Sequence, residues 1–489
     1  MALLKIFKRA KKPWGYSWRS SSAFTVACVV VALFAETFTH GFVIPILPYI
    51  LEKRNNVDPK DTQQFTYLIL TTYGATAVVS GPVIGQLTDR FKYPKIILAI
   101  GLGIAFLGTA ILATSTNLIN VFLGRIIQAV GSTVSQVVGH ATLNDVVKPQ
   151  NMGMILGIVN AFISAGAFSG PAISGFMLEY FGYWKTWMIV FGILSLDIVL
   201  RLLVIDHRKI KDKRKQAKAK KDEENRNATS LPEGVNEYTS LISNISKKPY
   251  SLTKGISDVT KGCTSMFSFY WTLLSQPMIL IGLVSYMTRS SLMASFNTTL
   301  PTHVRDLFGW GSFPAGMLFV GLQAPGMVLD PLFGWIRRRG GNKILTGLGF
   351  ILLGPLLWLL GVVNQDWLPW SGSEHMVKIV YVIVIVCIGC IQNLPGSVGA
   401  AEITAVMEHL ESETPGIFGT KGGNSRGHSL SNGSFNLGQF MGPLLSGSLA
   451  DNLGYDSMTS TLCGICFVTS VLTITFMKDK SPRRRKWWG

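Results

Sequence analysis

Two stretches of this chain repeat one frame of small residues, 272 positions apart (432 − 160 = 272). Residues 160–183 read NAFISAGAFSGPAISGFMLEYFGY, and residues 432–455 read NGSFNLGQFMGPLLSGSLADNLGY. The shared pairs are Asn160/Asn432, Gly166/Gly438, Phe168/Phe440, Gly170/Gly442, Pro171/Pro443, Ser174/Ser446, Gly175/Gly447, Gly182/Gly454 and Tyr183/Tyr455. Glycines four residues apart let a neighbouring backbone approach one helix face, and a Gly-Pro pair bends a helix. Both stretches are mostly apolar, so the repeat indicates a duplicated membrane protein.

The composition agrees with a chain that crosses a bilayer many times. Of the 489 residues, 48% are hydrophobic and only 15% are charged, against about 25% charged in soluble domains. Apolar runs of about 20 residues recur and predict about twelve spans. These are residues 22–51, 64–87, 95–115, 117–147, 160–183, 184–205, 276–300, 313–335, 344–363, 378–406, 432–455 and 459–476. The predicted fold class is an all-α polytopic membrane protein with two pseudo-symmetric six-helix halves.

The net charge of +18 is distributed in a way that predicts orientation. Basic residues gather before the first span, after the second, sixth and eighth spans, and after the last. An even number of spans places all these segments on one side, which is expected to be cytosolic, with both termini inside. The predicted domains are a basic N-terminus (1–21), the first half (22–205), a basic linker (206–270), the second half (271–476) and a basic tail (477–489).

Charged side chains inside the spans are the candidates for function, because a charge in the bilayer core is costly unless it faces a cavity or a partner. They are Glu36, His40, Arg125, Asp197, Arg201, Arg289 and Glu402. Glu36 with Arg125 is the first candidate for proton coupling, and the alternative is a static ion pair. His40 lies one turn from Glu36 and is either a titrating group or a packing residue. Asp197 and Arg201 are also one turn apart and can pair with each other.

Three motifs resemble those of a known family. The loop after the second span resembles G-x-L-x-D-R-x-G-R-K through Gly85, Leu87, Asp89 and Arg90, but departs from it at Lys92, Tyr93 and Pro94. The fourth span resembles R-x-x-Q-G through Arg125 and Gln128, with Ala129 in place of glycine. The fifth resembles G-x-x-x-G-P-x-x-G-G through Gly166, Gly170, Pro171 and Gly175, with Ser174 in place of one glycine. The chain therefore resembles the major facilitator superfamily, and within it the twelve-span drug:proton antiporters and the related vesicular amine transporters.

This resemblance implies a major facilitator fold, in which two halves rock around a midplane site, and the motif of the fifth span implies export. Glu36 holds the position of an acidic residue in the amine transporters, nine positions before Pro45, and Asp197 resembles their sixth-span aspartate. Their aspartates in the tenth and eleventh spans match the neutral residues Gln392 or Asn393 and Asn432.

The predicted roles follow from these motifs and from the charges in the spans. The proton-coupling residues are Glu36, His40, Arg125 and Asp197. The substrate-binding residues are Gln128, Arg289, Gln392, Asn393 and Asn432. The residues of conformational change are Gly85, Asp89, Arg90, Gly166, Gly170, Pro171, Gly175, Gly438, Gly442 and Pro443.

No feature of the sequence favours an enzyme or a metal protein. The Gly423–Gly427 stretch matches a hydrolase elbow but lies in a polar loop, and no G-x-x-x-x-G-K-[ST] stretch for ATP occurs. The pairs Cys387/Cys390 and Cys463/Cys466 lie inside spans without a nearby histidine, so they predict packing and no metal site.

The function predicted is a proton-coupled antiporter that exports small organic molecules such as drugs, toxins, secondary metabolites or amines. The alternatives are a proton-coupled importer of a nutrient or vitamin and a non-transporting membrane sensor or scaffold. The expected partners are a small-molecule substrate, protons and the lipid bilayer, with no nucleic acid, and the chain is expected to be a monomer. No cofactor is expected, because the proton gradient supplies the energy. The plasma membrane is favoured over a vacuolar or other intracellular membrane.

Overall fold

The computed structural model describes residues 15–90, 94–147, 149–204, 270–271, 273–340, 342–396, a few residues between 402 and 413, and 424–477. The chain divides into two compact units, Asp206–Gln276 and the remainder, Met1–Ile205 with Pro277–Gly489. Everything below concerns this larger unit. The predicted basic linker and the basic tail lie almost entirely outside the described residues, as does most of the basic N-terminus.

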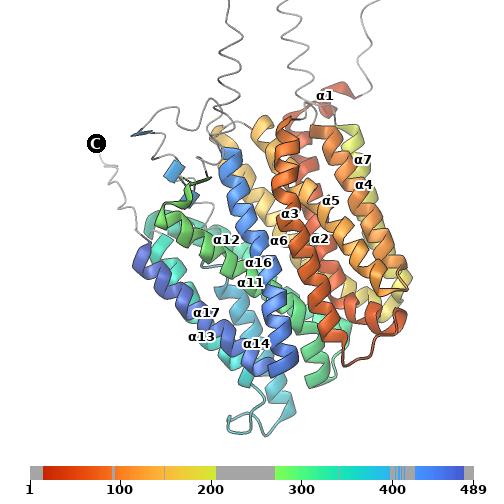
Figure 1. The fold of residues 1–489 in the computed structure, drawn as a ribbon, viewed down its shortest axis with the longest axis vertical. Coiled ribbons are helices and arrows are strands. Elements are labelled where there is room, and N and C mark those ends of the chain that lie inside the picture. Colours follow the sequence, from red (N-terminus) through yellow and green to blue (C-terminus); the bar gives the residue numbers. More distant parts are fainter. Residues whose placement is uncertain are drawn as a thin grey trace, which may run out of the picture. The chain divides into compact units, whose positions relative to one another are not determined.

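Among the described residues, twelve long helices build the larger unit, with the first six (red to yellow) beside the last six (green to blue) in Figure 1. The first six are α2 (Ser22–Tyr49), α3 (Thr62–Arg90), α4 (Pro94–Thr114), α5 (Leu118–Val146), α6 (Pro149–Phe181) and α7 (Tyr183–Leu203). The last six are α11 (Pro277–Phe308), α12 (Ser312–Gly340), α13 (Asn342–Val362), α14 (Glu374–Ile391), α16 (Asn424–Leu453) and α17 (Tyr455–Phe476). A short helix, α1 (Tyr16–Arg19), precedes them, and a π-helical turn, η2 (Ile50–Arg54), continues α2.

Eleven of these helices in the described part of the chain are long and apolar enough to cross a membrane. The twelfth, α16, is as long as the others but carries many serines, asparagines and glycines, so its hydropathy alone does not identify it. It packs along α11 and α3 inside the bundle, where polar side chains are shielded from lipid. The predicted all-α polytopic fold is therefore confirmed.

Each half has its own hydrophobic core. In the first half, α2, α4, α5 and α7 bury a cluster that centres on Phe42 and Trp187, both fully buried. In the second half, α11 to α14 and α17 bury a cluster that includes Phe296, Phe319 and Phe350. Most of each cluster stays within one half, while Ile44 of α2 packs into the cluster of the second half.

The tenth predicted span differs from the structure. A continuous helix over residues 378–406 was expected, but α14 ends at Ile391 and the chain turns at Gln392 and Asn393. Pro395 explains this break, because a proline removes a backbone donor and disfavours helix in the residue before it. Gly396 follows with φ 51°, a left-handed conformation that suits glycine.

The repeated frame recurs in the structure at the starts of α7 and α17. Gly182 with φ 80° and Gly454 with φ 88° precede these helices, and this backbone conformation favours glycine. The tyrosines that follow both glycines are buried. Tyr183 donates a hydrogen bond to the carbonyl of Ala113 over 2.7 Å, which ties α7 to α4.

The Gly-Pro helices pack closely against the first helix of their own half. A Cβ atom added at Gly170 on α6 would lie 2.4 Å from the carbonyl oxygen of Phe38 on α2. A Cβ atom added at Gly442 on α16 would lie 2.5 Å from the carbonyl oxygen of Ser291 on α11. The predicted close approach of two backbones is therefore present in both halves.

Candidate functional site

The first candidate site surrounds Glu36, in the middle of α2. Glu36 is 8% exposed, and the Tyr73 hydroxyl on α3 donates a hydrogen bond to its Oε1 over 3.3 Å. Oε2 is buried and has no hydrogen-bond partner among the described residues. Ser132 and Gln136 on α5 also face this carboxyl group. Glu36 is therefore enclosed by neutral polar groups from two neighbouring helices.

Arg125 on α5 is fully buried against the Tyr73 ring. Its guanidinium carbon lies 4.8 Å from the centre of the Tyr73 ring, and its Nη1 donates to Oε1 of Gln128 over 2.7 Å. Gln128 in turn donates to the Thr109 hydroxyl on α4 over 3.1 Å. The structure records no ion pair between Arg125 and Glu36, so a static ion pair is ruled out in this conformation. Tyr73 contacts both groups, Glu36 through its hydroxyl and Arg125 through its ring.

His40, one turn after Glu36, packs on the same tyrosine. The His40 and Tyr73 ring centres are 4.6 Å apart, and Nδ1 of His40 is buried without a hydrogen-bond partner in the described part of the chain. Three of the residues named from the sequence, Glu36, His40 and Arg125, therefore meet around Tyr73. Sequence reasoning missed Tyr73, although its place in the polar run Thr71–Gly74 of an apolar span was a usable signal.

Asp197 belongs to a separate cluster. Its Oδ1 lies 3.6 Å from Nε of Arg201, one turn further along α7, and the two side chains are 0% and 4% exposed. Cys28 on α2, two turns before Glu36, interacts electrostatically with both Asp197 and Arg201. Asp197 thus has a cation beside it on its own helix, as the alternative interpretation expected. Its role in proton coupling stays a prediction.

The second half holds its own polar cluster, around Arg289 on α11. Nε of Arg289 donates to the carbonyl of Gln392 over 3.1 Å, and Nη2 donates to Oδ1 of Asn393 over 3.2 Å. Both acceptors lie where α14 breaks, so the break positions them. Asn432, half-buried on α16, makes no hydrogen bond to these three residues. The structure therefore joins three of the five residues predicted to bind substrate, while Gln128 belongs to the Arg125 cluster.

Asp330 and Tyr286 are two members of this second cluster that sequence reasoning missed. Asp330 lies on α12 inside a candidate span, and both Asp330 and Arg289 act electrostatically on Tyr286 of α11. The signal was available, because Asp330 is an acidic residue within the eighth predicted apolar run.

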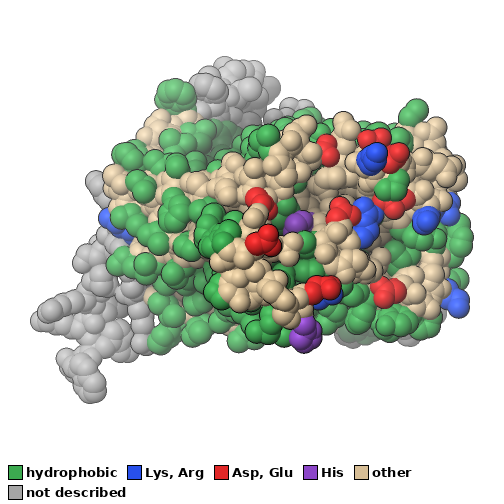
Figure 2. Space-filling view, turned by 90° about the horizontal axis from the view of Figure 1, so that it is seen from below, with side chains coloured by type: hydrophobic (Ala, Val, Ile, Leu, Met, Phe, Trp, Pro, Cys, Tyr) green, Lys and Arg blue, Asp and Glu red, His purple; other side chains and the backbone are tan. Residues whose placement is uncertain are grey.

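A latch of polar contacts joins the two halves at the end of the unit away from α1. Nη1 of Arg305 on α11 lies 2.5 Å from Oε1 of Glu52 on η2, and the Thr62 hydroxyl donates to the same oxygen over 2.8 Å. Gln63, on the first half, also exchanges hydrogen bonds with the carbonyl of Thr298 and the hydroxyl of Thr302 on the second. Figure 2 shows this end, with Asp and Glu side chains spread over its centre and hydrophobic side chains around them.

The two Gly-Pro helices also contact the opposite half near the same end. The Glu179 carboxylate on α6 accepts a hydrogen bond from the backbone N–H of Phe313 on α12 over 2.9 Å. A Cβ atom added at Gly447 on α16 would lie 2.1 Å from Cβ of Tyr67 on α3. Towards the opposite ends of the same four helices, a Cβ atom added at some glycines meets nothing within 4 Å; these are Gly81, Gly85, Gly157, Gly334 and Gly433. The contacts of Glu179 and Gly447 therefore close the interface between the two halves, called the seam below, at the Glu52 end.

Comparison with known proteins decides the family. A profile of the Major Facilitator Superfamily matches residues 29–416. The chain belongs to the major facilitator superfamily. The resemblance expected from the three motifs is therefore confirmed for the family.

Relatives of this facilitator are named as transporters. The MFS-type transporter ppzB of Metarhizium rileyi is 25% identical over 95% of this chain and 97% of its own length. The class E tetracycline resistance protein of Escherichia coli is 22% identical over 71% of this chain and 74% of its own length. The synaptic vesicular amine transporter of Homo sapiens is 22% identical over 59% of this chain and 46% of its own length. These names indicate a transporter of small molecules rather than an enzyme.

The residues predicted to govern conformational change fall into two groups in this facilitator. The glycines of the Gly-Pro helices and Pro171 lie on the packed interfaces; Gly175, for example, would place a Cβ atom 2.2 Å from the carbonyl oxygen of Ser312 in the other half. Pro443 lies inside α16 in the same way as Pro171 lies inside α6. Asp89 and Arg90 end α3, and their side chains lie outside what the structure describes.

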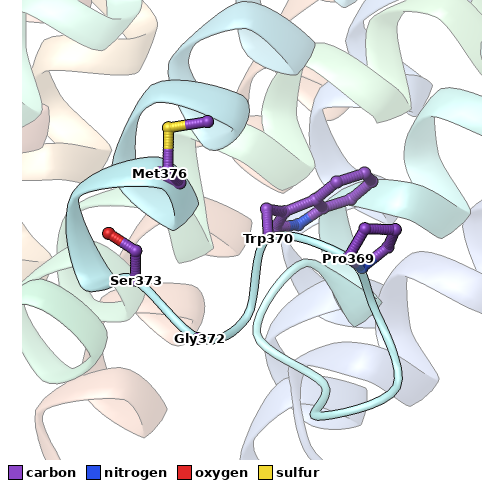
Figure 3. A pocket seen from close by; sticks show the side chains of 5 residues that line it. All are labelled: Pro369, Trp370, Gly372, Ser373 and Met376. Carbon is purple, nitrogen blue, oxygen red and sulfur yellow. The ribbon is translucent and has the colours of Figure 1, made fainter.

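A shallow pocket of about 340 Å³ lies in the loop between α13 and α14 and is drawn in Figure 3. Its lining residues are Pro369, Trp370, Gly372, Ser373 and Met376, none of which is charged. The loop folds on itself, since Trp370 donates to the carbonyl of Val363 over 3.2 Å. This pocket contains none of the residues of the Glu36 or Arg289 clusters, so it is separate from both.

Proposed function

We propose that this facilitator is a proton-coupled antiporter that exports small organic molecules by alternating access. In this proposal the end that carries α1 faces the cytosol, and the Glu52 end faces outside at the plasma membrane. Protons enter through the Glu36 cluster while substrate leaves. The names of the tetracycline resistance protein and the vesicular amine transporter support a substrate that is a small organic molecule.

The observation that carries the proposal is the environment of Glu36. Its buried Oε2 has no hydrogen-bond partner among the described residues, and its charge is not balanced by Arg125 in an ion pair. A carboxylate of this kind is costly in its charged form. Such a carboxylate is suited to take up a proton when it is accessible from one side of the membrane and to release the proton when it is accessible from the other side. Tyr73 provides the contact through which the state of Glu36 reaches Arg125.

The latch supports alternating access. The closed seam at the Glu52 end corresponds to a state that receives substrate from the opposite, cytosolic side. For that end to open, the contact between Glu52 and Arg305 has to break. In addition, α3 has to separate from α16, and α6 has to separate from α12. Because most of each hydrophobic cluster lies within one half, this motion keeps most of that packing, and the contact of Ile44 with the second-half cluster is the one that changes.

The test uses the full chain in proteoliposomes with an acidic lumen, with ethidium and tetracycline as probes. An antiporter accumulates probe in the acidic lumen, and Glu36→Gln should reduce accumulation to the level of protein-free vesicles. A pH-sensitive dye inside the vesicles should report probe-dependent proton exit from the lumen for the wild-type protein only.

Glu374→Gln is the matched control, because Glu374 is 77% exposed at the start of α14. It should transport like the wild-type protein. Unchanged accumulation in Glu36→Gln would remove Glu36 from the mechanism. Accumulation by the wild-type protein only when the lumen is alkaline would establish the importer instead.

A further inference from the structure

His140 is a titratable side chain of α5 that the proposed mechanism does not use. It lies in the part of α5, Leu118–Leu143, that is long and apolar enough to cross a membrane, and it is half-buried. Ionisable side chains inside a span are costly, so they are kept where they pair with a partner or lie along a polar path. Histidine is also the side chain that most readily exchanges a proton near neutral pH. A polar path from His140 to Glu36 would therefore be a path for protons.

The packing of α5 against α2 fixes which residues of the two helices lie side by side. A Cβ atom added at Gly139 on α5 would lie 3.4 Å from Cγ1 of Val29 and 3.6 Å from Cδ2 of Leu33, both on α2. The two helices are the first and fourth spans, so they run in opposite directions, and each step back along α5 faces a step forward along α2. Gln136 comes three residues before Gly139, and Glu36 comes three residues after Leu33. The register thus places Gln136 beside Glu36, which agrees with the polar neighbours of this carboxyl group on α5.

His140 is bonded to Gln136, one turn earlier on α5. Its Nδ1 lies 2.8 Å from the carbonyl oxygen of Gln136. A carbonyl oxygen only accepts, so Nδ1 carries the hydrogen, and in the neutral ring Nε2 then keeps the lone pair that accepts a proton. Four residues rise about 6 Å along a helix axis, a gap that the Gln136 side chain and one water molecule can bridge. Glu36, Gln136 and His140 are therefore successive positions on one polar path.

This path leads away from the latch. The helix α5 begins at the Glu52 end, since Arg54 of η2 donates to the carbonyl of Ser115, just before α5, over 3.2 Å. It therefore runs from that end towards the end that carries α1. Glu36 is 8% exposed, whereas His140 is half-buried. With the Glu52 end closed, the accessible end of the path is the one at His140.

We infer that His140 relays the proton that Glu36 releases towards the cytosolic side. This inference rests on the proposed proton-coupled antiport and adds the exit route of the proton. The proton of the Glu36 carboxyl group passes through a water molecule beside Gln136 to Nε2 of His140, which leaves a carboxylate and an imidazolium. The imidazolium then gives its proton to water at the α1 end and becomes neutral again. The net result is one proton moved from Glu36 to water on that side.

Two assays in proteoliposomes separate a proton relay from a packing role. Probe-driven proton exit from an acidic lumen requires release of the proton at the α1 end, whereas exchange of labelled for unlabelled ethidium at equal pH involves no net proton movement. His140→Asn keeps a donor for the Gln136 carbonyl but cannot carry a proton. It should lower the proton flux by about tenfold or more and leave the exchange unchanged. His140→Glu restores a side chain that carries a proton, so it should recover most of the flux.

Two matched controls should behave like the wild-type protein in both assays. Thr142→Val removes the same kind of bond, from a side chain to the carbonyl four residues earlier, on the opposite face of α5. His375→Asn removes a histidine that is exposed at the start of α14. A loss of flux in Thr142→Val as large as that in His140→Asn would indicate packing of α5 and count against the relay.

Wild-type proton flux in His140→Asn would overturn the inference. So would an equal loss of flux and exchange in that variant, or a flux in His140→Glu as low as in His140→Asn. If Glu36→Gln abolishes the flux while His140→Asn keeps it, this inference falls and the proposed function stands. If the wild-type protein shows no probe-driven proton flux, the proposed function falls and this inference falls with it.

Discussion

Tyr73 is the residue that three buried groups of the first half share. Its hydroxyl donates to Glu36, while its ring packs on His40 and lies under the guanidinium of Arg125. The ring and the hydroxyl therefore have separate tasks. The ring packs against buried polar groups, and in the proposed mechanism the hydroxyl responds to the charge state of Glu36.

Two substitutions at Tyr73 should separate these tasks. Tyr73→Phe keeps the ring and removes one hydrogen bond, so we expect a loss of about 1 kcal/mol or less in stability but a clear loss of probe-driven proton flux. Tyr73→Leu also removes the cation–π contact and the aromatic packing, so it should unfold at a distinctly lower temperature. Thermal unfolding and vesicle proton flux measure the two effects. Normal proton flux in Tyr73→Phe would show that the hydroxyl has no part in coupling.

At the scale of helices, α6 and α16 each have two packing tasks. Gly166 and Gly170 bring α6 against the backbone of α2, and Gly438 and Gly442 bring α16 against α11. Further along, Gly175 and Gly447 contact the opposite half. Each Gly-Pro helix thus has a fixed interface with its own half and a second interface that has to separate when the Glu52 end opens.

Alanine substitutions along α6 should reveal the fixed interface. A Cβ atom at Gly166 would lie 2.3 Å from the Thr37 hydroxyl and 2.6 Å from the Phe34 carbonyl oxygen, so Gly166→Ala should destabilise the protein by about 1–3 kcal/mol. Gly157→Ala on the same helix meets nothing within 4 Å and should be neutral or slightly stabilising, because alanine favours helix. Thermal unfolding in detergent compares the two. Equal melting temperatures would contradict the close packing of α6 on α2.

The helices also show what the sequence could and could not predict. The apolar runs and the repeated frame predicted the helices and the two halves correctly, because span length and small-residue spacing are local properties. The end of α14 at Ile391 was missed, although Pro395 was a local signal for it. Glu36 was paired with Arg125 and placed one turn from His40, but their shared contact with Tyr73 could not be predicted, because it depends on how three helices rotate about their axes.

At the scale of the whole larger unit, the latch is one of the contacts that close the Glu52 end of the interface between the two halves. Arg305→Ala removes the ion pair with Glu52, which is partly exposed and therefore contributes about 1 kcal/mol or less. We expect the population that is open at the Glu52 end to rise up to about fivefold. Lys60 is exposed on the first half and Asn364 on the second. The distance between spin labels at these two positions should be long in a larger fraction of Arg305→Ala molecules than of wild-type molecules.

Lys378→Ala is the control for this experiment, because Lys378 pairs with Glu374 over 2.5 Å within α14 and does not join the halves. It should leave the distance distribution unchanged. An Arg305→Ala distribution like that of the wild-type protein would show that the helix seams alone keep this end closed.

The break in α14 has a consequence for the charge of Arg289 during transport. The carbonyl groups at a helix C-terminus carry partial negative charge, and Gln392 offers one of them to Arg289. This counterion consists of main-chain atoms, so no proton can neutralise it and no side-chain substitution can delete it. A carboxylate in its place would release the arginine whenever it became protonated. The anchor that holds Arg289 to the end of α14 is therefore independent of any proton that a side chain takes up or releases.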